Sequence, residues 1–148
     1  MCAFLLGDNM NEYIDILLEL ADEAESIGDI PVGAIVVKDG KIIGKGFNNR
    51  VDTKKTTGHA EINAILDACN SIGDWRLSDC DLYVTLEPCD MCLETIKEAR
   101  IKNVYYLLSN MEKHKYKRTN VCNLKCDNFI FKNYKEKLSN FFDKNLNR

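Results

Sequence analysis

Two short segments of the 148-residue chain carry the residues that constrain it most: His59-Ala60-Glu61 and Pro88-Cys89-Asp90-Met91-Cys92. One imidazole and two thiols are good ligands for a single divalent metal ion, and nitrogen and sulfur donors in a tetrahedral shell suit Zn²⁺. Three protein ligands leave the fourth position of the ion to a water molecule, as in catalytic zinc sites. The sequence therefore predicts one catalytic Zn²⁺, with His59, Cys89 and Cys92 as its ligands.

The spacing of these residues predicts where they lie on their helices. Residues i and i+2 of a helix point ~200° apart, so His59 and Glu61 can serve one site only if His59 lies at the mouth of its helix. Cys89 and Cys92 are at i and i+3, and both face the same way from a first helical turn. Both segments are therefore expected at helix N-termini, where the positive end of the helix dipole favours thiolate.

The same pattern, His-x-Glu followed by Pro-Cys-x-x-Cys, is the signature of zinc deaminases. Zinc would lower the pKa of its water to ~7 and so supply hydroxide near neutral pH. Glu61 would take the proton of that water and pass it to the ring nitrogen and the departing amine. The predicted reaction is hydrolytic deamination, with attack at an amidine carbon and loss of ammonia.

A structural zinc site or a redox pair is the alternative for an isolated Cys-x-x-Cys motif. A structural site needs a fourth ligand, for which the chain offers Cys69, Cys80, His114, Cys122 and Cys126. None of these has the paired spacing of a second zinc knuckle. We expect Cys69 and Cys80 to be core residues and the Cys122-x-x-x-Cys126 pair to be incidental.

Length and composition predict one domain over residues 1–148, long enough to bury a core without disulfides. The chain is 45% hydrophobic and 29% charged, as is usual for a soluble globular protein. It holds no apolar run of ~20 residues and no basic N-terminal leader, so neither a membrane span nor a signal peptide is expected. Seven cysteines, an odd number with two at metal spacing, fit a reducing, cytoplasmic setting.

Charge is unevenly distributed along the chain. The net charge is −3, but residues 1–96 hold 7 Lys+Arg and 18 Asp+Glu, or −11, whereas residues 97–148 hold 13 and 5, or +8. A basic C-terminal third can bind a polyanion, although a solvated Lys-rich helix surface explains the same charge.

Hydrophobic periodicity predicts an α/β chain. Expected helices cover residues 11–27, 59–70, 88–100 and 133–145; expected strands cover residues 33–38, 41–47, 81–86, 103–108 and a part of 121–131. Asp39-Gly40 predicts a tight hairpin turn, and residues 48–57 are expected to form a loop. The strand–helix–strand order over residues 81–108 predicts a parallel pair. The fold class is therefore α/β, a three-layer α/β/α sandwich around a mixed sheet of about five strands.

The chain resembles the bacterial tRNA-specific adenosine deaminase family along nearly its whole length. Besides the two metal segments, the similar stretches are Ile30-Pro31-Val32-Gly33-Ala34, Gly44-Lys45-Gly46-Phe47-Asn48, Trp75-Arg76-Leu77, Leu82-Tyr83-Val84-Thr85-Leu86-Glu87 and Leu138-Ser139-Asn140-Phe141-Phe142. The resemblance implies a cytidine deaminase-like fold and a homodimer that converts the wobble adenosine, A34, of a tRNA anticodon stem-loop to inosine. It also implies that Asn48 hydrogen-bonds the flipped base and that Val32 lines the pocket.

One stretch departs from that family. Residues 109–120 replace its usual RNA-facing loop with a sequence that holds the basic run 113–118 and, within it, Tyr116. Lysine and arginine can bind phosphates and tyrosine can stack on bases, so RNA remains the predicted substrate. The same departure leaves open a deaminase of free guanine, cytosine or dCMP. A third hypothesis is a non-catalytic, zinc-stabilised RNA-binding subunit, against which the carboxylate of Glu61 argues.

Overall fold

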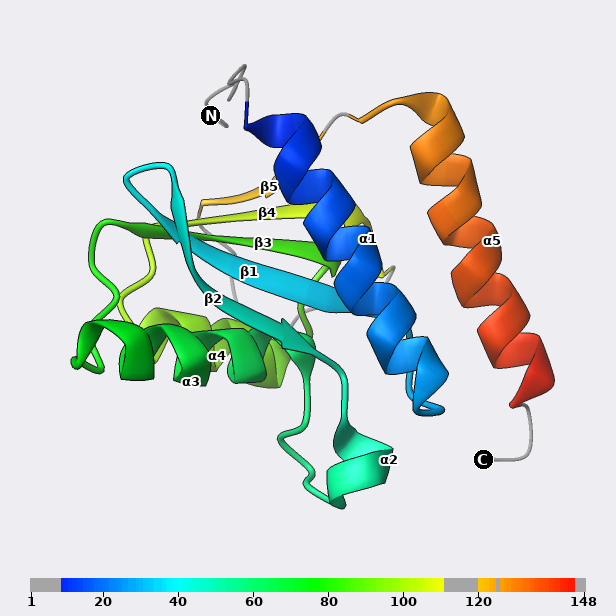
Figure 1. The fold of residues 1–148 in the computed structure, drawn as a ribbon, viewed down its shortest axis with the longest axis horizontal. Helices are drawn as coiled ribbons and strands as arrows, with labels where there is room; N and C mark the ends of the chain where they lie inside the picture. The colour runs from blue at the N-terminus through cyan, green and yellow to red at the C-terminus, as the bar shows by residue number, and fades with distance from the viewer. Residues whose placement is uncertain (1–8, 111–119, 125, 146–148) are drawn as a thin grey trace.

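The computed structural model describes residues 9–110, 120–124 and 126–145, which form a five-stranded mixed sheet between two layers of helices (Figure 1). The strands are β1 (Gly33–Lys38), β2 (Lys41–Phe47), β3 (Cys80–Leu86), β4 (Asn103–Leu108) and β5 (Val121–Asn123). The helices are α1 (Met10–Ser26), α2 (Arg50–Thr53), α3 (Ala60–Ile72), α4 (Asp90–Glu98) and α5 (Asn128–Lys144). The predicted fold class, including the number of strands, is confirmed.

The sheet has the strand order β2-β1-β3-β4-β5. β1 is antiparallel to both β2 and β3, whereas β4 is parallel to β3 and to β5. The β1–β2 hairpin turns through Asp39 and Gly40, which both have positive φ angles, 50° and 76°. Such angles are those of a two-residue turn that continues the twist of its strands, as the Asp-Gly pair predicted.

The continuous apolar run of β1 is buried on both faces of the sheet. Ala34 and Val36 join the core under α3 and α4, and Ile35 and Val37 join the core under α1. Alternate residues of a strand point to opposite faces, so such a run requires a helix layer on each side. Figure 1 shows α3 and α4 together below the sheet, and α1 with α5 beside it across the other face.

Two glycines of β2 let α3 approach the sheet closely. A Cβ atom on Gly44 would lie 2.4 Å from the carbonyl oxygen of Ala64, and one on Gly46 would lie 2.4 Å from that of Ala60. No side chain fits at such distances, so the α3 backbone packs directly on β2. This contact fixes the position of the first turn of α3 and of the histidine before it.

The structure corrects three details of the sequence prediction. Pro88 does not open the third helix: Cys89 is the N-cap in an extended conformation, and α4 begins at Asp90. The predicted loop 48–57 contains one helical turn, α2. α5 begins at Asn128 rather than near residue 133, because the Asp127 carboxylate accepts a capping hydrogen bond from the Phe129 N–H.

Two further predictions stay untested by the fold. The basic run 113–118 lies outside the described residues. That residues 1–148 are a single domain stays a prediction. No helix within the described ranges is both long and apolar enough to span a bilayer.

Candidate active site

His59 lies at the mouth of α3, as the spacing of His59 and Glu61 required. It is the N-cap residue, with the extended angles φ −97° and ψ 147°, and the helix begins at Ala60. Glu61 lies in the first turn and is 4% exposed. Because His59 has not yet entered helical geometry, its ring and the Glu61 carboxylate both reach one pocket.

The two cysteines come from the start of α4. Cys89 is its N-cap, with φ −73° and ψ 172°, and Cys92 is a buried residue of its first turn. His59 Nδ1 lies 3.7 Å from Cys89 Sγ and 3.3 Å from Cys92 Sγ. A tetrahedral zinc ion with Zn–N ~2.0 Å and Zn–S ~2.3 Å separates its ligand atoms by roughly 3.5–3.8 Å. The three side chains therefore fit one zinc ion.

The thiols of Cys89 and Cys92 have different pKa values. A hydrogen bond from the Cys92 thiol, with a further one from the His59 ring, lowers the pKa of Cys89 to about 4. The same contact and burial raise the pKa of Cys92, and the hydrogen bond to Cys89 raises the pKa of His59. The low pKa favours the thiolate form of Cys89, and a bound cation would remove the proton of Cys92.

Glu61 has a proton affinity suited to acid–base chemistry. Burial away from water raises the pKa of its carboxyl to about 7, although the positive charge of His59 nearby acts to lower it. A group whose pKa lies near the working pH can both accept and donate a proton during one reaction cycle. Burial at the pocket floor therefore prepares Glu61 for the predicted proton transfer.

A pocket of about 450 Å³ brings the predicted site residues together. His59, Glu61 and Cys89 line it, along with Asn48 and Val32. The Asn48 N–H donates a 3.2 Å hydrogen bond to the Val32 carbonyl, so these two residues lie side by side. The buried Cys92 lies behind the pocket and is not in its lining.

Sequence reasoning missed the far walls of this pocket. Ser109 and Asn110 line it directly after β4, and both hydrogen-bond Glu87: Ser109 Oγ donates to Oε1 at 2.8 Å and Asn110 Nδ2 to the carbonyl at 2.9 Å. Parallel strands end at one edge of a sheet, so the residues after β4 belong beside those after β3. That rule could have found Ser109 and Asn110 from the sequence.

Two other helices also contribute to the walls. Arg50 opens α2, whose second residue, Val51, donates its N–H to the carboxylate of the buried Asp29 at 2.9 Å. From α5 come Lys135, which no local motif marks, and Leu138 and Phe142, the two ends of the family-like stretch 138–142. Phe142 is 49% exposed and lines the pocket, so it does not anchor α5 in the core.

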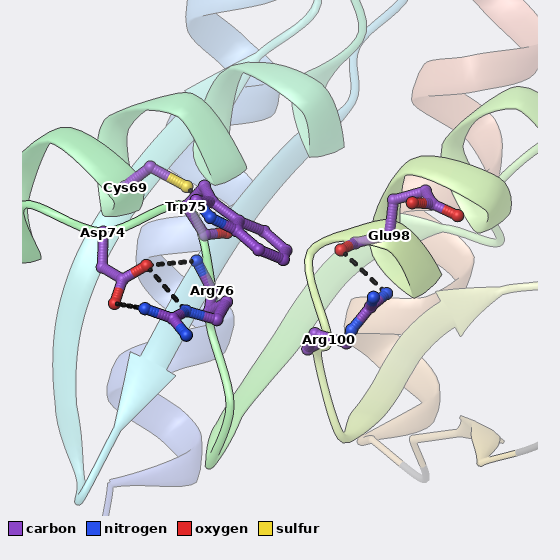
Figure 2. Close-up of polar contacts among 6 residues, drawn as sticks. All are labelled: Cys69, Asp74, Trp75, Arg76, Glu98 and Arg100. Carbon is purple, nitrogen blue, oxygen red and sulfur yellow. Dashed lines mark hydrogen bonds and ion pairs between the residues drawn. The ribbon is translucent and has the colours of Figure 1, made fainter.

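The Trp75-Arg76-Leu77 stretch lies outside the pocket, before β3 begins (Figure 2). Asp74 accepts hydrogen bonds from the backbone and guanidinium of Arg76, which lowers the pKa of the Asp74 carboxyl. The guanidinium carbons of Arg76 and Arg100 lie 5.5 and 5.6 Å from the Trp75 ring centre. Leu77 alone enters the core, so this similarity to the deaminases marks packing and not the site.

The remaining thiols do not extend the metal site. Among the described residues, His59, Cys89 and Cys92 are the one group of three or more metal-ligating side chains close enough to share an ion. Cys80 is buried in the core, as predicted, whereas Cys69 is partly exposed and its Sγ donates to the Trp75 carbonyl. Cys122 and Cys126 belong to no such group either, and the fifth candidate, His114, lies outside the described residues.

Known proteins with similar sequences are tRNA deaminases. The tRNA-specific adenosine deaminase of Haemophilus influenzae is 48% identical over 90 residues, which are 60% of this chain and 52% of that protein. The enzyme of the same name from Streptococcus pyogenes is 44% identical over 100 residues, 68% of this chain and 63% of that one. The chain thus spans less than two thirds of the length of these curated relatives. The sequence resemblance to tRNA-specific adenosine deaminases is confirmed.

Solved structures give the same fold with two different substrates. A structure from a study of A-to-I editing by tRNA:A34 deaminases at the wobble position has a TM-score of 0.70 and 31% identity, and covers 77% of this chain and 98% of its own. Guanine deaminase from Bacillus subtilis has a TM-score of 0.64 and 43% identity, over 68% of this chain and 65% of its own.

The metal site also matches a family. The family described as the cytidine and deoxycytidylate deaminase zinc-binding region matches residues 8–108, which contain all three predicted ligands and Glu61. Zinc, the predicted cofactor, is the metal that this family binds. Because the match covers more than half of the chain, the chain belongs to the cytidine and deoxycytidylate deaminase zinc-binding family.

Proposed function

We propose that this protein is a zinc-dependent hydrolase that deaminates the wobble adenosine, A34, of a tRNA anticodon to inosine. One observation carries the proposal: His59, Cys89 and the buried Glu61 line a single pocket, with Cys92 directly behind it. The arrangement pairs a three-ligand metal site with a carboxyl group whose pKa is raised to about 7. A purely structural metal site has no use for such a carboxyl group, which argues against a non-catalytic RNA-binding subunit.

In this proposal His59, Cys89 and Cys92 hold the zinc ion. Zinc, when bound, acidifies a water molecule so that hydroxide is available near neutral pH. Glu61 takes a proton at its carboxylate and delivers it to the ring nitrogen of the base. It then moves a second proton, from the hydroxyl group added to the ring carbon, to the departing amine, so that the carbon becomes a carbonyl and ammonia leaves. Burial of Glu61 keeps this proton from exchanging with bulk water during the reaction.

Asn48 and Val32 are proposed to position the base. Asn48 Oδ1 accepts the N–H of Ala60, so the Nδ2 group is the donor that Asn48 offers to a ring nitrogen or carbonyl. Val32 supplies an apolar wall, 4% exposed, against the face or edge of the base. One polar group and one apolar wall are the elements that fix a flat heterocycle in a pocket.

A polyanionic substrate is supported by charge and by the relatives. α5 carries Lys132, Lys135, Lys137 and Lys144 within the basic C-terminal third, and Lys135 lines the pocket. Arg50, the first residue of α2, also lines the pocket. Cationic side chains at a pocket rim suit the phosphates on either side of a flipped nucleotide. The relatives named above as tRNA deaminases support the same substrate.

Deamination of free guanine is the second candidate, supported by the 43% identity to Bacillus subtilis guanine deaminase. The two substrates differ in charge and size, so a parallel assay separates them. Zinc-loaded protein is incubated with an anticodon stem-loop carrying A34, with guanine and with cytosine, and inosine or ammonia is measured. Inosine from the stem-loop alone is the expected result; turnover of a free base without inosine would replace the proposal with the second candidate.

We propose in addition that the enzyme is a cytoplasmic homodimer. The cytoplasm follows from the proposed substrate, a tRNA anticodon stem-loop. The homodimer follows from the resemblance to tRNA-specific adenosine deaminases, and Leu66 of α3, an apolar side chain that is 57% exposed, is the position chosen to test it. Sedimentation of the wild type and of Leu66→Glu tests the dimer: the variant should sediment as a monomer, and a monomeric wild type would contradict it.

A further inference from the structure

A buried chain of hydrogen bonds joins α5 to the two strands beneath the pocket. Tyr134 Oη lies 2.8 Å from the Pro31 carbonyl oxygen and 2.8 Å from Thr85 Oγ1. Thr85 Oγ1 in turn accepts the Gly33 N–H at 3.2 Å. Tyr134 is 2% exposed and Thr85 is fully buried. These contacts connect residues that are 103 and 49 positions apart in the chain.

The protons of this chain can be assigned. A phenol has one proton, and a carbonyl oxygen can only accept, so Tyr134 donates to Pro31. The contact between the two hydroxyls then has Thr85 donating to Tyr134, while Thr85 itself accepts from Gly33. Every donor in the chain has an acceptor, and burial raises the pKa of the Tyr134 phenol, which keeps its proton in place. A fully satisfied buried network holds its members in one geometry.

The network attaches α5 to the sheet through buried hydrogen bonds, beside a small apolar cluster. The apolar cluster under α5 contains three buried residues, Tyr134, Leu138 and Ala21 of α1. An ion pair between Lys137 and Asp22 also joins α5 to α1, but it lies at the surface and such pairs contribute little. The Tyr134 hydroxyl is therefore placed to decide how α5 sits on the sheet.

The face of α5 beside Tyr134 forms a wall of the pocket. Lys135, Leu138 and Phe142 line it and are spaced i, i+3 and i+7, which puts them on one stripe of the helix. Val32, directly after the Pro31 carbonyl to which Tyr134 donates, lines the same pocket. One hydroxyl group thus links two segments, far apart in the chain, that both line the site.

We propose that the Tyr134 hydroxyl is a positioning group that sets the width of the substrate pocket by fixing α5 against the Pro31–Val32 segment. Its effect on substrate binding rests on the proposed function. The hydroxyl does not touch the reacting atoms. Its loss changes the fit of the body of the substrate and leaves the chemistry at Glu61 and the metal ligands unchanged. Such an interaction is made equally in the ground state and the transition state, so its loss raises KM and spares kcat.

Tyr134→Phe tests the proposal, because it removes the hydroxyl and keeps the buried ring. Tyr13→Phe is the matched control: Tyr13 is also buried, and its hydroxyl donates to the Gly40 carbonyl at 3.0 Å, in a hairpin outside the pocket lining. We expect Tyr134→Phe to raise the KM of the substrate found in the parallel assay about fivefold, the effect of one lost hydrogen bond. Its kcat and zinc content should stay within twofold of the wild type, and Tyr13→Phe should change neither constant.

A second measurement is independent of the substrate. Hydrogen exchange of the α5 amides, residues 128–144, should become about fivefold faster in Tyr134→Phe than in Tyr13→Phe, because α5 then opens locally more often. Thr85→Val should speed the same amides, and the double variant should show less than the product of the two single effects, as coupled residues do.

The outcomes separate the two proposals. Unchanged exchange of the α5 amides in Tyr134→Phe would overturn the attachment of α5 by this hydroxyl. Faster exchange with an unchanged KM would overturn its role in substrate fit. If the wild type turns over neither the stem-loop nor a free base, the proposed function fails, whereas the exchange measurement still decides the role of Tyr134.

Discussion

Asn48 Oδ1 accepts a 2.7 Å hydrogen bond from the backbone N–H of Ala60, which joins the end of β2 to the first residue of α3. This N–H is one of the N-terminal amides of α3 that have no partner inside the helix. The bond also fixes the orientation of the Asn48 amide, since only the oxygen can accept from an N–H. Asn48 therefore holds the helix that follows His59, and in the proposed function its Nδ2 group is the donor to the substrate.

Two substitutions of Asn48 separate these roles. Asn48→Asp keeps an acceptor for the Ala60 N–H, which a carboxylate at a helix N-terminus satisfies well, but removes the Nδ2 donor. We expect its free energy of unfolding to stay within ~1 kcal/mol of the wild type and its kcat/KM to fall at least about tenfold. Asn48→Ala should in addition lose about 1–3 kcal/mol of stability, because the Ala60 N–H is buried without a partner. Urea unfolding measures the stability of each variant, and steady-state kinetics measures its kcat/KM. A wild-type kcat/KM in Asn48→Asp would contradict the donor role of Asn48.

Glu61→Gln should leave zinc binding and the fold intact and abolish most turnover. The amide has nearly the shape of the carboxyl group but cannot exchange a proton, and general acid–base catalysis contributes about 10²–10⁴-fold. We expect kcat to fall by that factor while each chain still binds one zinc ion, measured by metal analysis. Glu94→Gln, an exposed position on α4, is the control and should retain wild-type kcat. Undiminished turnover in Glu61→Gln would show that another group moves the proton.

The zinc-free protein should carry one unusually reactive cysteine. The pKa of Cys89 is lowered to about 4, chiefly by the hydrogen bond from Cys92, so Cys89 is a thiolate at all pH values well above 4 and is protonated only as pH falls through that value. An ordinary thiol is roughly 0.3% thiolate at pH 6. Alkylation by iodoacetamide at pH 6 should therefore modify Cys89 before any other cysteine, although a low-pKa thiolate is intrinsically a weaker nucleophile. Mass spectrometry identifies the modified cysteine, and bound Zn²⁺ should protect Cys89 from modification. Preferential modification of Cys80 would contradict this expectation.

Most of the fold was accessible from local sequence patterns, and the exceptions have physical causes. β1 could be recognised because a central strand buried on both faces must be continuously apolar. The start of α4 was misplaced by two residues because proline is common at the first helical position. Here the residue after Pro88, Cys89, stays extended at ψ 172° and helps form the cluster with His59. The contact with His59 thus accompanies a backbone that departs from the local preference.

The pocket was predictable only in part. The metal ligands and Glu61 lie at helix mouths, where their spacing reveals them, but Lys135 and Phe142 enter the site through tertiary packing of α5. Their position depends on Tyr134 reaching Pro31, 103 residues away, and no pattern within α5 encodes that contact. Because such distant residues line the pocket, the sequence alone predicted the chemistry more sharply than the substrate.

Gly44→Ala should destabilise the protein and weaken zinc binding together. The added Cβ would lie 2.4 Å from the Ala64 carbonyl oxygen and 2.7 Å from the Ala68 nitrogen, so α3 must move away from β2. Overpacking of this kind costs about 1–3 kcal/mol, and the shift displaces His59 relative to the two cysteines. Urea unfolding and a zinc titration check both effects. Lys45→Ala, at the next position and with an exposed side chain, is the control and should change neither the stability nor the zinc affinity. If Gly44→Ala loses stability but binds zinc normally, α3 pivots without moving its first turn, and the predicted coupling is wrong.

Lys135→Ala should distinguish a tRNA substrate from a free base. Lys135 lines the pocket from α5, where it can neutralise a phosphate next to the flipped nucleotide, and each such contact adds about one to the slope of log K against log salt. The variant should bind the A34 stem-loop more weakly at low salt and show a salt slope smaller by about one, measured by fluorescence anisotropy.

Lys132→Ala is the matched control, an exposed lysine of the same helix outside the pocket lining, and should affect binding less. Guanine carries no phosphate, so a guanine deaminase would show the same KM with and without Lys135. An unchanged stem-loop slope, together with guanine turnover whose KM is the same with and without Lys135, would therefore contradict the tRNA proposal.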